Sequence, residues 1–204
     1  MSISNNIIIQ EKPEFVSWEE IHNALASAHA DNIRRGIRNA LPARPAEEVR
    51  KLVEGRGKMF VAISDGKVVG TGAIIKVQRA FWCGKQSYAY LCLGSVLPEY
   101  KNQGIHKRIH NKLEDEAKNM GVECVFFDAH EHNNRILDIH KNGDFIPVGL
   151  TACKDHFNII MMKWLNESPY PHWYLKFRFQ LSKLYLKTRY KMVPGKGRVK
   201  RFGI

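Results

Sequence analysis

The stretch SVLPEYKNQGIHK, residues 95–107, places one glycine between a polar loop and the start of a long amphipathic helix pattern. The first backbone N–H groups of a helix lack intrahelical partners and carry the positive end of the helix dipole, so a loop leading into them can bind phosphate. Gly104 has no side chain and lets a ligand approach the backbone closely. Lys101 and Lys107 add positive charge nearby. The stretch therefore predicts a pyrophosphate-binding loop.

Two better-known phosphate loops do not fit this stretch. A Walker loop needs GxxxxGK followed by Ser or Thr, and a dinucleotide fingerprint needs several glycines, whereas only Gly104 is present here.

A second group of polar residues follows the apolar run VECVFFDAH. Asp128, His130 and His132 alternate along the expected strand and would face one side, whereas Glu131 would face the other. His130 and Glu131 are the candidates for chemistry on the substrate side. No spacing in this group is diagnostic of a metal site, so none is expected.

The elements that position these residues follow from hydrophobic spacing and turn signals. Ser17 and Glu20 form a capping box at the start of one helix. Asp65 and Gly66 form a turn typical of a tight β-hairpin. We expect strands at 6–10, 58–64, 67–78, 86–97, 122–130, 145–152 and 158–165, and helices at 17–33, 44–55, 104–120 and 133–144. This order indicates an α/β fold with a mixed sheet.

Taken together, these features resemble the GNAT superfamily of N-acetyltransferases. The family typically has V-x-P after a strand and then R/Q-x-x-G-x-G/A at the start of a helix. Here Val96-Leu97-Pro98 precedes Lys101-Asn102-Gln103-Gly104-Ile105-His106, with lysine at the Arg/Gln position and histidine at the last small position. The resemblance implies a mixed, mostly antiparallel central sheet with helices on both faces. It covers residues 60–165 approximately.

The downstream part of the resemblance lies in NNRILDIHKNGDF. Asn133 follows the strand, where the family carries an asparagine, and Phe145 matches the phenylalanine of Tyr-x-x-x-Gly-Phe. Asp144 stands at the glycine position. His140 stands at the tyrosine position, where the family commonly has a donor to the departing thiolate. An imidazole can fill that role, and a histidine that only packs on the helix remains the alternative.

The resemblance implies acyl-CoA as co-substrate and a specific set of binding residues. Acyl transfer to an amine needs a deprotonated amine, a donor to the oxyanion and stabilisation of the thiolate. Backbone N–H groups around the end of the strand would hold the thioester, and the loop would hold the pyrophosphate. The expected cofactor-binding residues are Ser95, Val96, Leu97, Lys101, Asn102, Gln103, Gly104, Ile105, His106, Lys107 and Asn133, and the expected catalytic residues are His140, Glu131 and His130.

The positive charge is concentrated at the C-terminal end. Residues 167–204 contain ten Lys and Arg against one acidic residue, a net charge of +9 out of +12 for the chain. Trp173, Phe177, Leu181 and Leu184 lie at helical spacing in this segment. Such a segment could lie on an anionic membrane surface, meet an acidic carrier protein, pack on its own domain or form a homodimer. It lacks an aromatic-basic RNA motif, so nucleic acid is disfavoured.

These observations predict a cytoplasmic enzyme, peripheral to the membrane if the tail binds lipid. We expect a GNAT-like domain over residues 1–167 and a basic amphipathic extension over residues 168–204. The four cysteines are scattered and fit reduced thiols, and no signal peptide or membrane span is expected. The predicted activity is acyl-CoA-dependent N-acyl transfer (EC 2.3.1.-), with acetyl-CoA as the default donor. The alternatives are a long-chain acyl-CoA or acyl-carrier-protein acyltransferase at the membrane, and an inactive GNAT-like binding module.

Overall fold

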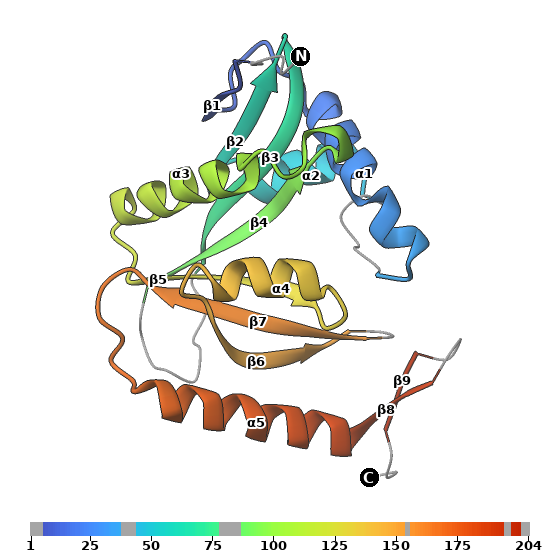
Figure 1. Cartoon of the computed structure of the whole chain (residues 1–204), viewed down its shortest axis with the longest axis vertical. Coiled ribbons are helices and arrows are strands. Elements are labelled where there is room, and N and C mark those ends of the chain that lie inside the picture. The colour runs from blue at the N-terminus through green and yellow to red at the C-terminus, as the bar shows by residue number, and fades with distance from the viewer. Residues whose placement is uncertain (1–5, 38–43, 78–86, 154–155, 194–196, 201–204) are drawn as a thin grey trace. The chain divides into compact units, whose positions relative to one another are not determined.

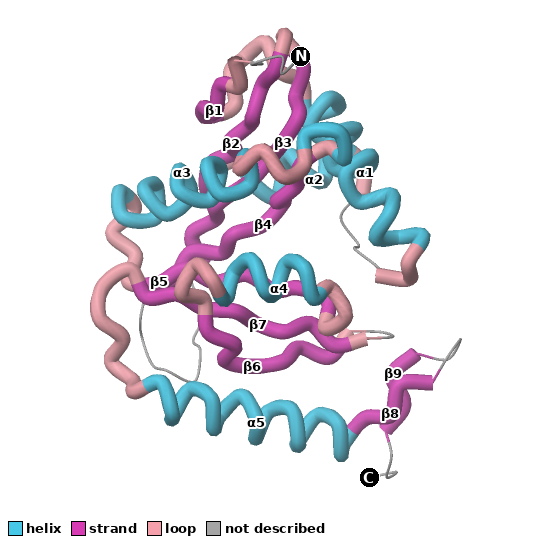
Figure 2. Tube along the Cα trace, viewed as in Figure 1, coloured by secondary structure: helices cyan, strands magenta, loops and turns pink. Residues whose placement is uncertain are grey.

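A computed structural model of the chain describes residues 6–37, 44–77, 87–153, 156–193 and 197–200. Helices and strands follow each other in the predicted order, with one further pair of strands at the C-terminal end (Figures 1 and 2). The elements are β1 Ile8–Glu11, α1 Trp18–Arg34, α2 Ala46–Val53, β2 Gly57–Ser64, β3 Lys67–Val77, β4 Tyr88–Val96, a 3₁₀ turn Pro98–Tyr100, α3 Ile105–Asn119, β5 Cys124–His130, α4 Asn134–Lys141, β6 Ile146–Ala152, β7 Phe157–Trp164, α5 His172–Arg189, β8 Tyr190–Val193 and β9 Gly197–Lys200.

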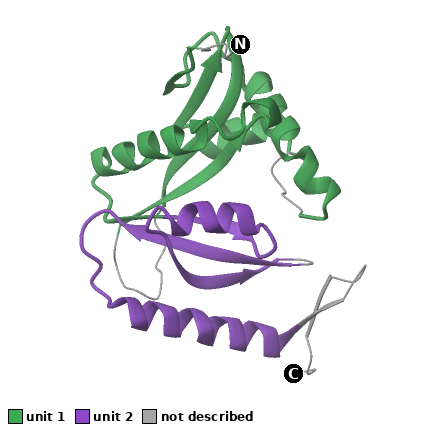
Figure 3. Cartoon of the chain, viewed as in Figure 1, with its two compact units in different colours: residues 1–125 green, residues 126–204 purple. Residues whose placement is uncertain are grey.

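Seven strands form the main sheet in the order β1-β2-β3-β4-β5-β7-β6, which confirms the predicted mixed α/β architecture. The pairs β1–β2, β2–β3, β3–β4 and β6–β7 are antiparallel. Asp65 and Gly66 both have positive φ, at 49° and 76°, as the predicted β2–β3 turn requires. By contacts the chain divides into two compact units, residues 1–125 and 126–204 (Figure 3).

In the first unit, helices cover both faces of β2 and β3. Val61 and Ile75 belong to a buried cluster with Ile21 and Leu25 of α1 and residues of α2. On the other face, a Cβ added at Gly72 would lie 2.6 Å from Ile109 Cγ2 of α3. Glycine at this position therefore allows α3 to pack directly on the strand.

Sequence signals explain where α1 begins and which face of α3 packs on the sheet. The Ser17 hydroxyl accepts the Glu20 N–H at 3.1 Å, and Glu20 Oε2 accepts the Ser17 N–H at 2.8 Å, so the predicted capping box forms. In α3 the predicted four-residue repeat is buried and supplies the face that packs on the sheet. Its members are Ile105, Ile109, Leu113 and Ala117.

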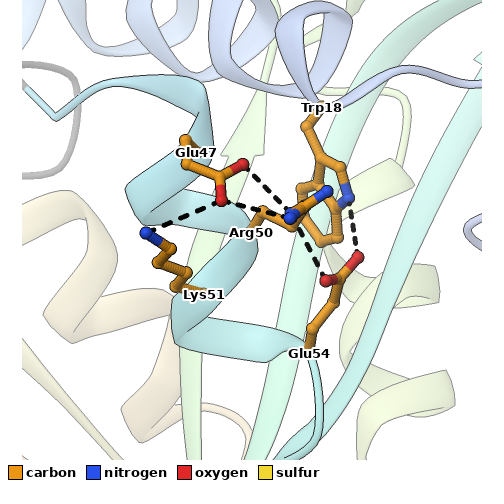
Figure 4. Close-up of polar contacts among 5 residues, drawn as sticks. All are labelled: Trp18, Glu47, Arg50, Lys51 and Glu54. Atoms are coloured by element: carbon orange, nitrogen blue, oxygen red, sulfur yellow. Dashed lines mark hydrogen bonds and ion pairs between the residues drawn. The ribbon is translucent and has the colours of Figure 1, made fainter.

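One exposed hydrogen bond joins α1 to the end of α2, and several exposed ion pairs lie along α2 itself (Figure 4). Trp18 Nε1 of α1 donates to Glu54 Oε1 at 3.2 Å. Arg50 Nε lies 3.0 Å from Glu47 Oε2 and 3.4 Å from Glu54 Oε2, and Lys51 Nζ lies 3.7 Å from Glu47 Oε1. Exposed ion pairs of this kind contribute little stability each, so buried Val49 and Val53 are the main anchors of α2.

In the second unit, α5 runs alongside β6 (Figure 1). Ser182 Oγ of α5 accepts the Leu150 N–H of β6 at 3.2 Å, and Leu175 of α5 is fully buried. The predicted basic helix is therefore present. The division that we predicted between residues 167 and 168 stays a prediction. The contact-based division falls at 125/126, within β5, and keeps α5 with most of β5 and with β6 and β7.

Beyond α5 the structure has a pair of strands that the sequence did not indicate, β8 and β9, with Tyr190 opposite Lys200. One expectation about local structure was wrong. We expected His132 to continue the strand of Asp128 and His130, but β5 ends at His130 and the chain turns immediately afterwards.

Candidate active site

The predicted phosphate loop lies between β4 and α3 in the first unit. After the 3₁₀ turn, Asn102 and Gly104 both adopt left-handed backbone conformations, with φ of 64° and 74°. Gly104 is the N-cap of α3, and among the described residues no side chain caps this helix start. A Cβ added at Gly104 would meet nothing within 4 Å. An open, uncapped helix start of this kind fits an anionic group such as a pyrophosphate.

The other predicted loop residues have different surroundings. Asn102, Gln103 and Lys107 are exposed, and Gln103 Nε2 donates to the Glu99 carbonyl at 3.4 Å. Ile105 is buried in the core, so only its backbone can face a ligand. The His106 ring stacks on His110 with centroids 4.7 Å apart.

The strand that leads into the loop contains a bulge. Thr71 of β3 pairs with Ser95, and Ala73 pairs with Cys92, so Leu93 and Gly94 together stand opposite Gly72. Leu93 has a φ of 55°, which is uncommon for a residue with a branched side chain. Strained backbone of this kind persists only where neighbours hold it and often marks a functional site.

Thr71 is the neighbour that holds the bulge. Its Oγ1 donates to the Leu93 carbonyl at 2.6 Å and lies 2.7 Å from Ser95 Oγ. A hydroxyl has one proton to donate, so Ser95 is the donor in the second contact. Both hydroxyls are buried, which makes their mutual hydrogen bonds costly to lose.

Thr71→Val should therefore destabilise the chain while keeping the shape of the side chain. The carbonyl of Leu93 and the hydroxyl of Ser95 would both lose a buried partner, at a cost of about 1–3 kcal/mol in the free energy of unfolding. Urea unfolding measures this difference. Thr151→Val on β6 is the control, because Thr151 is exposed and its replacement should change stability by less than about 0.5 kcal/mol.

Backbone groups at the end of β4 differ in their availability. The Leu97 N–H, one of the predicted thioester contacts, already donates to the Val69 carbonyl at 2.9 Å. Successive residues of a strand point their N–H groups in opposite directions, so the Val96 N–H points away from β3. Within the predicted stretch 95–97, Val96 is thus the residue whose N–H does not face β3.

A histidine that the sequence analysis did not select lies beside the bulge. His29 is on α1, and its Nδ1 is buried without a hydrogen-bond partner. Burial lowers the pKa of the His29 imidazole from its ordinary value of 6.5, a backbone hydrogen bond with Gly94 opposes that change, and the charge of Lys101 adds to it. The Gly94 contact raises the pKa, so the imidazole donates there and the carbonyl accepts.

Gly94 is therefore approached by two imidazoles. A Cβ added at Gly94 would lie 3.9 Å from His106 Nε2 of α3. Because α1 and α3 cover opposite faces of the sheet, His29 and His106 reach the bulge from opposite sides. With one nitrogen of His29 donating to Gly94, its Nδ1 is left as an unpaired acceptor in the neutral ring.

The remaining predicted site residues lie in the second unit. Asn133 is the N-cap of α4, but its side chain makes no capping hydrogen bond, so capping does not account for its amide. His140 is buried near the end of α4, with ring centroids 4.1 Å from Phe127 and 5.1 Å from Phe145. Packing in this aromatic cluster fixes the imidazole firmly and is compatible with either alternative for His140.

His130 and Glu131 have structural partners. His130 Nδ1 accepts the His132 N–H at 3.1 Å, and its ring stacks on His156 with centroids 4.3 Å apart. Glu131 Oε1 accepts the Phe157 N–H at 3.3 Å, and Oε2 lies 3.8 Å from Lys187 Nζ. Both Glu131 oxygens thus tie the end of β5 to β7 and α5.

Comparison with known proteins gives one family and a consistent fold. Residues 18–143 match the family model described as the acetyltransferase (GNAT) family. The sequence has no significant match among curated proteins.

Three solved structures illustrate the likeness of fold. An acetyltransferase of the GNAT family from Staphylococcus aureus Mu50 has a TM-score of 0.62 at 18% identity, over 78% of this chain and 99% of that one. The ribosomal-protein-S18-alanine N-acetyltransferase from Escherichia coli has a TM-score of 0.59 at 16% identity, over 79% and 96%. The Salmonella typhimurium protein yncA, solved with its cofactor acetyl-CoA, has a TM-score of 0.59 at 15% identity, over 81% and 98%.

Proposed function

The chain belongs to the acetyltransferase (GNAT) family, and from this premise we propose that it transfers an acetyl group from acetyl-CoA to an amine. The observation that carries the proposal is the start of α3, where Gly104 is left-handed, open and without a side-chain cap. Backbone N–H groups from Gln103 to Lys107 would bind the pyrophosphate of CoA there. Lys101 and Lys107 would contribute positive charge to the same site.

When bound, acetyl-CoA supplies the thioester carbonyl and the thiolate leaving group. The Val96 N–H would donate to the carbonyl oxygen, as the proposed direction of this group along β4 allows. His29 would take the proton of the attacking amine at Nδ1, since a neutral imidazole with an unpaired nitrogen is a competent general base. Asn133 would bind the co-substrate, and His140 would donate to the thiolate.

Similarity to solved structures supports an amine as the acceptor. The Escherichia coli neighbour is named for a ribosomal-protein alanine, and its fold is shared over 79% of this chain. The matches give no support to a long-chain donor, an acyl-carrier protein or an inactive module. Acetyl therefore remains the proposed group, and the carboxylates of the β5 end are not needed as bases.

Gly104→Val should weaken CoA binding more than tenfold, which corresponds to about 1.4 kcal/mol or more. A β-branched residue is strongly disfavoured at the φ of 74°, so the loop would shift and its N–H groups would no longer converge on the phosphates. Titration calorimetry with CoA measures the effect.

Gly121→Val is the matched control for this experiment. Gly121 has a φ of 65°, also has open space where a Cβ would lie, and sits just beyond the opposite end of α3. This variant carries a similar backbone strain and should bind CoA with an affinity within about twofold of the unmodified chain. Equal CoA affinity in the Gly104→Val chain would refute the phosphate site, and equal losses in both variants would assign the effect to destabilisation.

A further inference from the structure

Helix α5 carries a row of large apolar side chains that face solvent. Trp173 is 69% exposed, Phe177 55% and Leu184 63%, and Leu181 and Tyr185 are also exposed. At 100° per residue these five positions fall on one side of the helix. A contiguous apolar row on a helix surface is characteristic of an interaction site and is unlike scattered exposed residues.

The opposite side of α5 already has a partner. Leu175 is fully buried, and Phe179, Ser182 and Leu186 on the same side are half-buried. The contact of Ser182 with Leu150 places this side on β6. The helix therefore has two apolar faces, and the described residues of the second unit cover only one of them.

Basic residues border the exposed row on both sides. Lys176, Lys183 and Lys187 follow one border, and Arg178 and Arg189 follow the other. The helix has no acidic residue, and residues 167–204 carry a net charge of +9. A surface that covers this face must accept tryptophan, phenylalanine and leucine at its centre and cations at its edges.

We propose that the exposed face of α5 lies on an anionic lipid surface. An amphipathic helix with aromatic and leucine side chains on one face and Lys and Arg beside them binds at the boundary of headgroups and acyl chains. Anionic headgroups attract the bordering cations, while Trp173 and Tyr185 suit the interface because their rings are apolar with a polar group. The proposal concerns binding at the surface, and none of the described helices is long and apolar enough to span a bilayer.

The charge of α5 favours lipid over a second copy of the chain. Two copies meeting through this face would bring ten basic side chains of α5 together without an acidic one, which is unfavourable. The inference is also independent of acetyl transfer, because it uses no residue of the proposed CoA or catalytic site.

Vesicle sedimentation with the full chain tests the proposal. We expect the chain to sediment with vesicles of phosphatidylcholine and phosphatidylserine and to stay in the supernatant with phosphatidylcholine alone. The bound fraction should fall as salt is raised, since screening weakens the attraction of the cations. Urea unfolding of the same protein preparation shows that the chain is folded.

Two double variants separate the apolar and the electrostatic contributions to lipid binding, and a third variant is the control. Trp173→Ser with Phe177→Ser should lower the lipid partition coefficient at least about tenfold through lost apolar burial, and Lys176→Glu with Lys183→Glu should do so through reversed charge. Phe15→Ser is the matched control, because Phe15 is 71% exposed but lies far from α5 in the sequence, and its loss should leave binding unchanged.

Several results would overturn the proposal. These are absence of binding to anionic vesicles, equal binding to neutral vesicles, and an equal loss with Phe15→Ser. A dimer in sedimentation velocity that dissociates on Trp173→Ser would instead assign the face to a second copy of the chain. Binding only to a nucleic acid or an acidic protein in place of the vesicles would likewise reject lipid.

Discussion

Replacing His140 with phenylalanine should lower kcat by about tenfold to a thousandfold and leave CoA affinity within about twofold, since one donor to a developing anion typically has an effect of this size. Phenylalanine keeps the aromatic packing with Phe127 and Phe145 and removes the ring N–H groups. The expected loss therefore reports the donor and not a cavity in the buried cluster.

The measurement is CoA release from acetyl-CoA with a panel of primary amines and peptide α-amines, followed by calorimetry with CoA. His140→Tyr is the matched variant, because the phenol restores a donor on an aromatic ring and should keep much of the activity. Wild-type kcat in the His140→Phe chain would show that His140 is structural. Equal loss in both variants, with reduced thermal stability, would point to packing instead.

Most of the fold was predictable because its signals are local. The capping box of α1, the Asp65-Gly66 turn and the four-residue repeat of α3 each act over a few residues, and the structure confirms all three. The pair β8–β9 was missed because its strands contain only four residues each, and their pairing gives no periodic pattern to read.

The candidate site was predictable only where a motif marks it. The loop around Gly104 has a recognisable pattern, and the structure supplies the open, uncapped helix start that the pattern implies. The β4 bulge at Leu93 could not be predicted, since it depends on the register with β3 and on the hydroxyl of Thr71. Likewise, the partners of Glu131 come from β7 and α5, far along the chain.

His29 was missed although one signal was present. Leu25 and Ala28 belong to the buried side of α1, and His29 follows Leu25 by four residues on the same side. His29 itself is half-buried, and a titratable side chain with a buried nitrogen on this side of a helix is informative when found.

His29→Gln should lower kcat by about a hundredfold to ten-thousandfold while CoA affinity stays within about twofold, as expected for the loss of a general base. The glutamine amide can still donate to the Gly94 carbonyl, but it cannot accept a proton from the amine. His22→Gln on the same helix is the matched control and should leave kcat within about twofold. Wild-type kcat in the His29→Gln chain would exclude His29 as the base.

The pH dependence of the rate and of the stability tests the role of His29 independently. Since burial lowers the pKa of His29 below 6.5, the native chain favours the neutral imidazole more than the unfolded chain does. The rate of the unmodified chain should therefore rise with pH below 6.5 and level off near neutrality, and His29→Gln should lack that rise.

The stability that His29 contributes is complete above pH 6.5 and is lost as pH falls through the lowered pKa, because protonation then favours unfolding. The free energy of unfolding, measured with urea between about pH 5 and 8, should decrease on the acid side in the His22→Gln chain, which keeps His29. The decrease should be smaller in the His29→Gln chain. An identical decrease in both would mean that the pKa of His29 is the same in the native and the unfolded chain, and the acid-side decrease would then not come from His29.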